Sequence, residues 1–308
     1  MKTSLSSVWP PAVMDQEFTS QIEADAASHP EWADLQNRLG LLRWAEGDLE
    51  GAIVAFEACL NLNPRYSWAS LNMAGCLATK GEFSKARAAI IDAADPVEGA
   101  KAVTEGWIAL LDGRPDTAEA AIRRIPPRRL ELANVLWLRA ATAENRDPAE
   151  GASMWRSVLE EPTIKAWYGE IDEIRTPREP GERRGGLFPG FGKLWLDLSQ
   201  SYAQLGRFEE AQKMARRSYL FWSERGDFLH HQGVLCQLQG NETQALQCWT
   251  EALDAAPEDS RSATALSFYY SRVGNLDAAM QHVEIAIDRS PGYADLHRQR
   301  GLLAAALG

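Results

Sequence analysis

Apolar side chains along the chain recur with the spacing of amphipathic helices, and turn residues separate them into short segments. The segments DLEGAIVAFEACL (48–60) and NETQALQCWTEAL (241–253) carry apolar residues at i, i+4 and i+7, which is the stripe of a helix with one buried face. Glycine tolerates the left-handed conformation that ends a helix, and proline cannot continue one. The pattern therefore predicts short helices joined by glycine and proline turns.

Several residue types recur in one frame, 34 residues apart. Gly206, Gly240 and Gly274 have this spacing, and the same step separates Gly47 from Gly81. Alanines and prolines repeat it: Ala52 and Ala86; Ala211, Ala245 and Ala279; Pro30 and Pro64; Pro257 and Pro291. A period of 34 residues with two helices per unit is the signature of tetratricopeptide repeats.

The chain resembles the tetratricopeptide repeat superfamily over roughly nine-tenths of its length. The resemblance implies an all-α fold, an α-solenoid whose antiparallel helix pairs stack into a right-handed superhelix. Helix A of each repeat would line a concave groove, the surface that repeat stacks use for binding. Small residues on helix A would let a neighbouring helix approach closely: Gly40, Ala74, Gly233 and Gly301.

The repeat frame divides the chain into four parts, with about six to seven repeats and a half repeat at each end. The expected parts are an N-terminal tail (1–13), an N-terminal block (14–162), an insertion (163–191) and a C-terminal block (192–308). The first block holds a half repeat at 14–30 and repeats at 33–66, 67–98, 99–127 and 128–162. The second holds repeats at 192–225, 226–259 and 260–293 and a closing helix at 294–308. The third repeat is short, and the register of the fourth is left open.

Composition narrows the class of protein. A formal net charge of −11 argues against nucleic acid as a partner, because phosphate contacts need clustered lysine and arginine. No apolar run is long enough to span a membrane, and residues 1–18 lack the apolar core of a signal peptide. The cysteines form no Cys-x-x-Cys pair, and each falls within an apolar helical pattern, which favours a reducing, cytoplasmic location.

No motif indicates catalysis, a cofactor or a metal. The sequence GFGKLW (190–195) lacks the first glycine and the hydroxyl residue of a phosphate-binding loop. His230 and His231 are adjacent, and therefore about 100° apart on a helix, which prevents both from holding one metal ion. We therefore expect a protein that is not an enzyme and needs no cofactor.

The resemblance also implies which residues line the groove. In the first half these are Asn37, Leu41, Trp44, Trp68, Leu71, Val103, Trp107, Leu110 and Leu136. In the second half they are Lys193, Gln200, Gln204, His230, Gln237, Arg261, Phe268, Arg272 and Arg298. Such a groove is apolar and aromatic in the first half of the chain, and polar and mildly cationic in the second half. It suits a protein or peptide partner with an amphipathic or acidic segment.

Two alternatives accompany this assignment. Half of the tryptophans would instead pack between helices, and for Trp155 and Trp249 on helix B the core is favoured. Some members of the superfamily bind a terminal carboxylate with a clamp of lysine, asparagine and arginine. Asn72 fits that clamp, but Asn37 and Leu41 stand where a lysine and an asparagine are needed, and without the cations a carboxylate gains no charge-assisted pairing.

The stretch IRTPREPGERRGGLFPGFGK (174–193) interrupts the repeats after a helical KAWYGEIDEI (165–174). Its aromatic end, with Phe188 and Phe191, is expected to dock onto the repeats, because a flexible linker needs no aromatic residues. The alternative is a disordered linker between two repeat blocks. The arginine-rich front would contact an acidic or phosphorylated segment through bidentate guanidinium groups: Arg175, Arg178, Arg183 and Arg184. A second cluster, at residues 123–129, is interpreted as solvated arginines at a repeat turn.

Two functions fit these observations. The first is a non-catalytic scaffold or adaptor that binds a protein or peptide segment in its groove and takes part in complex assembly. The second is a self-associating structural subunit that contacts another copy through its apolar C-terminal helix, 294–308, with Leu302, Leu303 and Leu307. The first predicts a monomer in isolation, and the second predicts a concentration-dependent oligomer.

Overall fold

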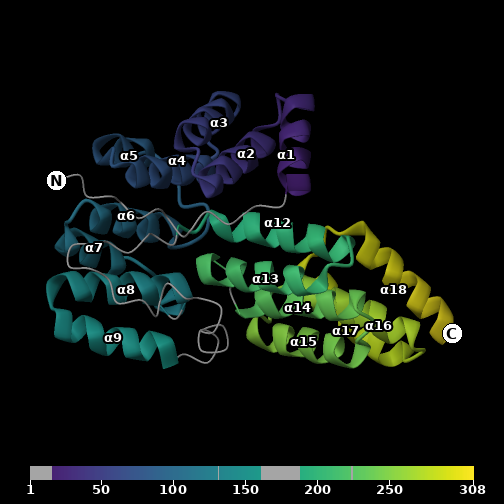
Figure 1. The fold of residues 1–308 in the computed structure, drawn as a ribbon. Helices are drawn as coiled ribbons and strands as arrows, with labels where there is room; N and C mark the ends of the chain where they lie inside the picture. The colour runs from purple at the N-terminus through teal and green to yellow at the C-terminus, as the bar shows by residue number, and fades with distance from the viewer. Residues whose placement is uncertain (1–15, 131, 161–187, 223–224) are drawn as a thin grey trace. The chain divides into compact units, whose positions relative to one another are not determined.

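A computed structural model describes residues 16–130, 132–160, 188–222 and 225–308, and within these ranges the regular elements are all helical (Figure 1). The expected all-α solenoid of helix pairs is confirmed. The chain forms two compact units, residues 1–197 with 220–222 and residues 198–219 with 223–308. The four-part division expected from the sequence stays a prediction, and the helix expected at 165–174 lies outside the described residues.

The described part of unit 1 contains a lone helix followed by pairs of consecutive helices, with one 3₁₀ turn at Pro127–Arg129. Its α-helices are α1 (Gln16–Ser28), α2 (Ala33–Glu46), α3 (Leu49–Leu62), α4 (Ser67–Lys80), α5 (Phe83–Ile90), α6 (Ala100–Leu111), α7 (Pro115–Ile122), α8 (Ala133–Arg146) and α9 (Pro148–Glu160). The helices α5 and α7 have eight residues each, against 14 in α3. The second helix of the third repeat is therefore short, as its residue count indicated.

One further helix, α12 (Phe191–Gln204), begins in unit 1 and continues into unit 2. Unit 2 continues with α13 (Phe208–Trp222), whose last three residues are grouped with unit 1. Its further helices are α14 (Arg225–Leu238), α15 (Glu242–Ala255), α16 (Ser260–Arg272), α17 (Leu276–Arg289) and α18 (Ala294–Leu307). Its core lies between successive pairs, where Trp249 packs with Cys236 and Leu266. Farther along, Val283 packs with Leu296 and Leu303 of the last helix.

Local chemistry sets the helix ends. Gly47 ends α2 with φ of 88°, and its backbone N–H donates to the Trp44 carbonyl; this left-handed conformation suits glycine. Gly206, Gly240 and Gly274 have the same sign of φ. At the other end of the turns, Asp48 and Asn241 cap α3 and α15 by accepting backbone N–H groups, which satisfies donors that have no partner inside the helix.

Close packing explains two of the small residues singled out on helix A. A Cβ atom at Gly40 would lie 2.4 Å from the Phe56 ring, and one at Gly233 would lie 2.4 Å from Trp249. The same expectation is wrong for Gly301, where no atom lies within 4 Å of a built Cβ. The reason is that Phe56 and Trp249 belong to the helix that follows in each repeat, and no described helix follows α18.

Candidate protein-interaction surfaces

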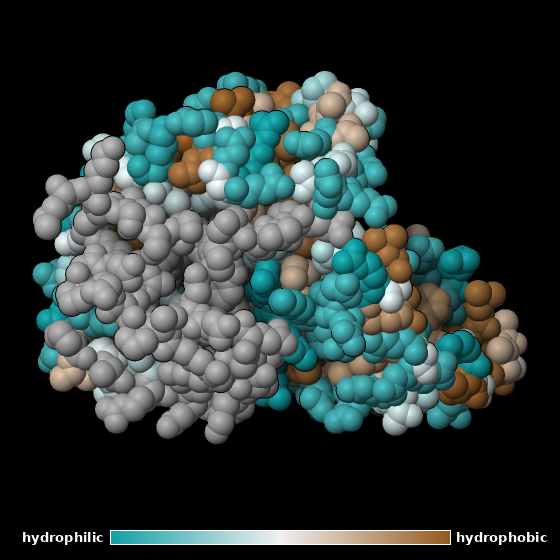
Figure 2. All heavy atoms as spheres, in the orientation of Figure 1, coloured by the Kyte–Doolittle hydropathy of each residue, from teal (hydrophilic) through white to brown (hydrophobic). Residues whose placement is uncertain are grey.

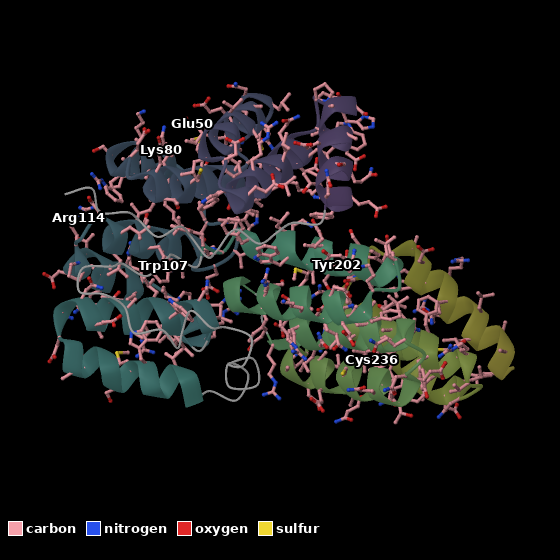
Figure 3. All side chains as sticks on the ribbon, viewed as in Figure 1. Glu50, Lys80, Trp107, Arg114, Tyr202 and Cys236 are labelled. Atoms are coloured by element: carbon pink, nitrogen blue, oxygen red, sulfur yellow. The ribbon has the colours of Figure 1, made fainter. Side chains whose placement is uncertain are left out.

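The groove residues expected in the first half of the chain are largely buried. Trp107 on α6 is fully buried (Figure 3). Trp68 and Leu136 are half-buried. The others are buried as well: Asn37, Leu41, Trp44, Leu71, Val103 and Leu110. The buried side chains are therefore not accessible to a partner in this structure.

One of the buried groove positions, Trp44, is covered by the aromatic end of the insertion. The Trp44 ring lies 4.6 Å from the Phe191 ring and 5.3 Å from the Phe188 ring, measured between centroids. Phe188 and Phe191 are both almost fully buried. The expectation that this aromatic end packs on the repeats is confirmed, whereas its role as a contact for a partner stays a prediction.

Residues 188–191 form a tight turn against α2 and α4. The Phe191 N–H donates to the Phe188 carbonyl at 3.3 Å, and the Gly192 N–H donates to the Pro189 carbonyl at 3.0 Å. Proline suits the second position of such a turn because its φ is already set. Gly190 lies so close to Asn72 that a Cβ atom would fall 1.7 Å from the Asn72 Oδ1 atom. Only glycine fits there without displacing the turn.

The floor under this turn consists of polar and small groups. Asn72 Nδ2 donates to Asn37 Oδ1 at 2.9 Å, and this pair is buried. Gly75 on α4 makes room for aromatic rings, since its Cβ would meet both Trp44 and Phe188 within 3 Å. We call Trp44, Asn72 and Gly75, with the pocket they form for the 188–191 turn, the filled groove.

An ion pair joins the middle of α12 to α2, the helix that carries Trp44. Arg38 Nε on α2 lies 3.2 Å from Asp197 Oδ2, and the Asp197 side chain is 14% exposed. Asp197 also accepts from Lys193 Nζ at 3.2 Å. Arg38, Gly75 and Asp197 were not predicted from the sequence as part of a site. The two partners in the ion pair are far apart in the chain, and no periodicity links them.

The arginines expected to bind an acidic segment, Arg175, Arg178, Arg183 and Arg184, lie outside the described residues. In the other basic cluster, Arg124 pairs with Glu105 and Arg128 pairs with Glu98. These two arginines are therefore matched by carboxylates, Glu105 within α6 and Glu98 just before it.

Unit 2 presents its expected groove residues at the surface. His230 is half-buried, and the others are exposed: Gln200, Gln204, Gln237, Arg261, Phe268, Arg272 and Arg298. Phe268 on α16 is 55% exposed, and Leu302, one period later on α18, is 65% exposed. Figure 2 shows hydrophobic residues among polar ones at the end of the chain where α18 lies. We call Gln200, Gln237, Phe268 and Leu302 the open face.

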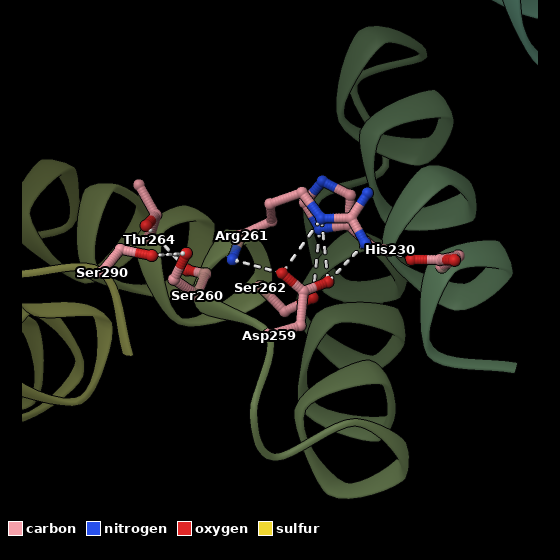
Figure 4. A network of polar contacts seen from close by, with 8 residues as sticks. His230, Asp259, Ser260, Arg261, Ser262, Thr264 and Ser290 are labelled. Atoms are coloured by element: carbon pink, nitrogen blue, oxygen red, sulfur yellow. Dashed lines mark hydrogen bonds and ion pairs between the residues drawn. The ribbon is translucent and has the colours of Figure 1, made fainter. Parts of the chain in front are cut away.

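The cations near the open face already have partners. Arg261 Nε donates to Asp259 Oδ2 at 2.8 Å, and the same guanidinium pairs with Asp227 (Figure 4). Burial raises the pKa of Asp259, but hydrogen bonds and charge from Arg261 outweigh it and lower that pKa overall. Arg272 pairs with Glu242 at 2.7 Å. The expected cationic character is therefore offset by carboxylates.

His230 and His231 face different neighbours. His230 Nδ1 lies 3.0 Å from Ser262 Oγ, while His231 Nε2 lies 2.8 Å from Ser199 Oγ. Burial lowers the pKa of both, and that of His231 falls to about 4. Among the described residues, no group of three His, Cys, Asp or Glu side chains is arranged to hold a metal ion.

The predicted core tryptophans are in the core. Trp249 is fully buried, and Trp155 packs edge-on against Trp137 with ring centroids 5.1 Å apart. Trp155 Nε1 donates to Glu144 Oε2 at 3.0 Å. No helix in the described ranges has the length and apolar character needed to cross a membrane.

Comparison with known proteins bears on the fold. No curated protein matches this chain. Among solved structures, the APC/C hetero-tetramer Cut9–Hcn1 is similar with a TM-score of 0.42 and 14% identity, over 94% of this chain and 46% of that one. The chain thus spans less than half of that protein. A tetratricopeptide repeat protein from Parabacteroides merdae matches with a TM-score of 0.37 and 14% identity, over 77% of this chain and 85% of that one.

The P58(IPK) TPR domain matches with a TM-score of 0.33 and 14% identity, over 94% of this chain and 92% of that one. At these TM-scores the structural likeness is weak and says nothing of partners. Two family models described as tetratricopeptide repeat match residues 43–102 and residues 192–219. With the 34-residue period and the paired helices, these matches show that the chain is a tetratricopeptide-repeat protein.

Proposed function

We propose that the chain is a non-catalytic scaffold that binds a protein segment on the open face of unit 2 and takes part in complex assembly. Tetratricopeptide repeats generally serve as interaction scaffolds, and stacks of repeats bind through the surface formed by their first helices. The observation that carries the proposal is the exposure of Phe268 and Leu302 in equivalent positions of α16 and α18. A contiguous exposed apolar patch marks an interaction site, and the proposal is that these two side chains, one period apart, belong to one such patch.

The chemistry of the open face favours a neutral, partly apolar partner segment. Phe268 offers an aromatic anchor, and aromatic residues contribute much of the affinity in protein interfaces. Gln200 and Gln237 offer both donors and acceptors to a backbone in an extended or helical segment. An acidic segment would have to replace Asp227 and Asp259 at Arg261, so a gain in charge pairing is small.

Site-specific photo-crosslinking tests the proposal. A photoreactive residue replaces Phe268 in one variant and Val273 in the other, and each variant is irradiated in a native cell extract. Val273 is the matched control because it is 51% exposed in the same unit but lies at the end of α16. We expect a discrete crosslinked protein from position 268 alone. Equal labelling from both positions, or none from position 268, would contradict the proposal.

Self-association through α18 is the second candidate function. It is favoured by the outward side chains of that helix and its flank, since Tyr293, Leu302 and Leu307 are all exposed. A second copy would bury these side chains. Light scattering over a hundredfold range of concentration tests it: the molar mass should rise with concentration and fall back to that of a monomer in Leu302→Asp. A constant monomer mass excludes this function.

A further inference from the structure

We infer that the 188–191 turn is a built-in ligand of the filled groove and competes there with a partner segment of similar chemistry. That partner carries two aromatic side chains three residues apart, joined by a turn with a small residue next to Asn72. The inference rests on the proposed scaffold function, since it assigns a second binding surface to the same chain. It concerns unit 1, whereas the open face lies in unit 2.

The contacts resemble those of a peptide bound in a groove. Phe188 and Phe191 lie on either side of one turn, and both rings contact Trp44. Two aromatic anchors in well-packed, water-excluded positions are the arrangement that dominates binding energy in peptide complexes. The turn contacts α2 and α4, the first helices of two repeats, which form the binding surface in repeat stacks.

The groove is shaped for a particular backbone as well as for the rings. Asn37 orients Asn72 through a buried hydrogen bond of 2.9 Å. Asn72 in turn leaves no space for a side chain at Gly190. Gly75 leaves room for the Phe188 ring, because a Cβ atom at this position would lie 2.8 Å from that ring. A partner therefore needs a small residue between its two aromatic anchors, and larger residues there are rejected.

The test is whether the groove, once emptied, takes the same sequence from solution. The probe is a fluorescein-labelled peptide with the sequence of residues 188–195, FPGFGKLW, and binding to the full chain is followed by fluorescence anisotropy. The emptied variant carries Phe188→Ala and Phe191→Ala. The control variant carries Val54→Ala and Ile91→Ala, which remove two exposed apolar side chains from the same unit.

We expect the emptied variant to bind the peptide at least about tenfold tighter than wild type or the control, because a groove that is rarely open has a proportionally weaker apparent affinity. A peptide with both phenylalanines replaced by alanine should lose that binding. A folded emptied variant that binds no better than wild type would overturn the inference. So would equal binding of the alanine peptide.

A second variant covers the case in which the emptied chain does not fold. Gly190→Ala keeps every ring but places a Cβ 1.7 Å from Asn72 Oδ1, which pushes the turn out of the groove. Gly292→Ala is its control, since nothing lies within 4 Å of the added atom. Peptide binding should rise in Gly190→Ala alone, and equal binding would overturn the inference. Neither result depends on crosslinking at Phe268, so failure here and failure of the proposed function are distinguishable.

Discussion

Ser199 Oγ accepts a hydrogen bond from His231 Nε2 at 2.8 Å while it donates its own proton to the Ala211 carbonyl at 2.6 Å. A serine hydroxyl has a single proton, so His231 must carry its proton on Nε2. Two periods later, Ser267 donates to the Ala279 carbonyl and accepts from Gln299 Nε2 at 2.9 Å. His231 and Gln299 thus donate the equivalent hydrogen bond to a serine hydroxyl in two different repeats.

Acidification should destabilise unit 2 through His231. Burial, and then the charge of His230, lower the pKa of His231 from 6.5 to about 4. Between those values the unfolded chain binds a proton that the folded chain does not, so stability falls as the pH falls. Between pH 7.5 and pH 5, protonation of His231 should lower the free energy of unfolding by about 2 kcal/mol. Urea unfolding at both pH values measures it.

His231→Gln should remove most of that loss, because glutamine can donate to Ser199 as Gln299 donates to Ser267. His230 also titrates nearby, beside Arg261, Asp259 and Asp227, so a remainder is expected. His29→Gln, an exposed histidine in unit 1, is the control. An unchanged pH dependence in His231→Gln would show that the buried imidazole is not responsible.

Substitution by alanine should destabilise the protein at Gly233 and stabilise it at Gly301. These two glycines occupy equivalent positions two periods apart. At Gly233 the added Cβ meets the Trp249 indole at 2.4 Å, and overpacking of this kind costs about 1–3 kcal/mol. At Gly301 the space is open, and alanine in a helix is favoured over glycine by about 0.5–1 kcal/mol. Thermal unfolding of both variants beside wild type measures the difference. Equal shifts in the same direction would contradict it.

Trp44→Ala should lower the stability of the folded chain. The substitution removes a buried ring that contacts both Phe188 and Phe191, and loss of a buried tryptophan costs about 3–5 kcal/mol. Trp32→Ala is the matched control, because that ring is half exposed, and its cost should be far smaller. Chemical denaturation compares them. A Trp44→Ala variant as stable as Trp32→Ala would mean that the filled groove adds nothing to the fold.

The thiols should react slowly in the native protein. Burial raises the pKa of Cys59 and of Cys76 to about 12, so the reactive thiolate is scarce near pH 8. Cys248 has a pKa raised to about 11 but is only half-buried, and it should react first. Titration with Ellman's reagent, with and without urea and with a Cys248→Ser control, tests this order. Rapid native labelling of Cys59 would contradict it.

Periodicity was sufficient to predict the helix pairs, because each repeat obeys the same local rules. Gly47 and Gly274 end helices as their frame required, and Trp249 lies in the core. Periodicity also contained a signal that was missed: Asp227 and Arg261 are one period apart, which places them on neighbouring helices of the stack. Their pairing could have been predicted from that spacing.

Other contacts have no such signal. Arg38 on α2 pairs with Asp197 on α12, and their separation along the chain fits no multiple of the repeat. The aromatic character of residues 188–191 predicted docking, but nothing in the sequence identified Trp44 as the neighbour. Among the expected groove residues in unit 1, Trp44 is covered by that long-range contact, which a repeat frame cannot predict.

A segment tethered to its own binding site acts at an effective concentration on the order of millimolar. The 188–191 turn is tethered in this way to Trp44 and Asn72. A free partner present near 1 µM would need roughly thousandfold tighter binding to hold the groove half of the time, a difference of about 4 kcal/mol. Weak ligands are therefore outcompeted by the tethered 188–191 turn. Only a partner that binds strongly, or at two sites at once, displaces the turn from the filled groove.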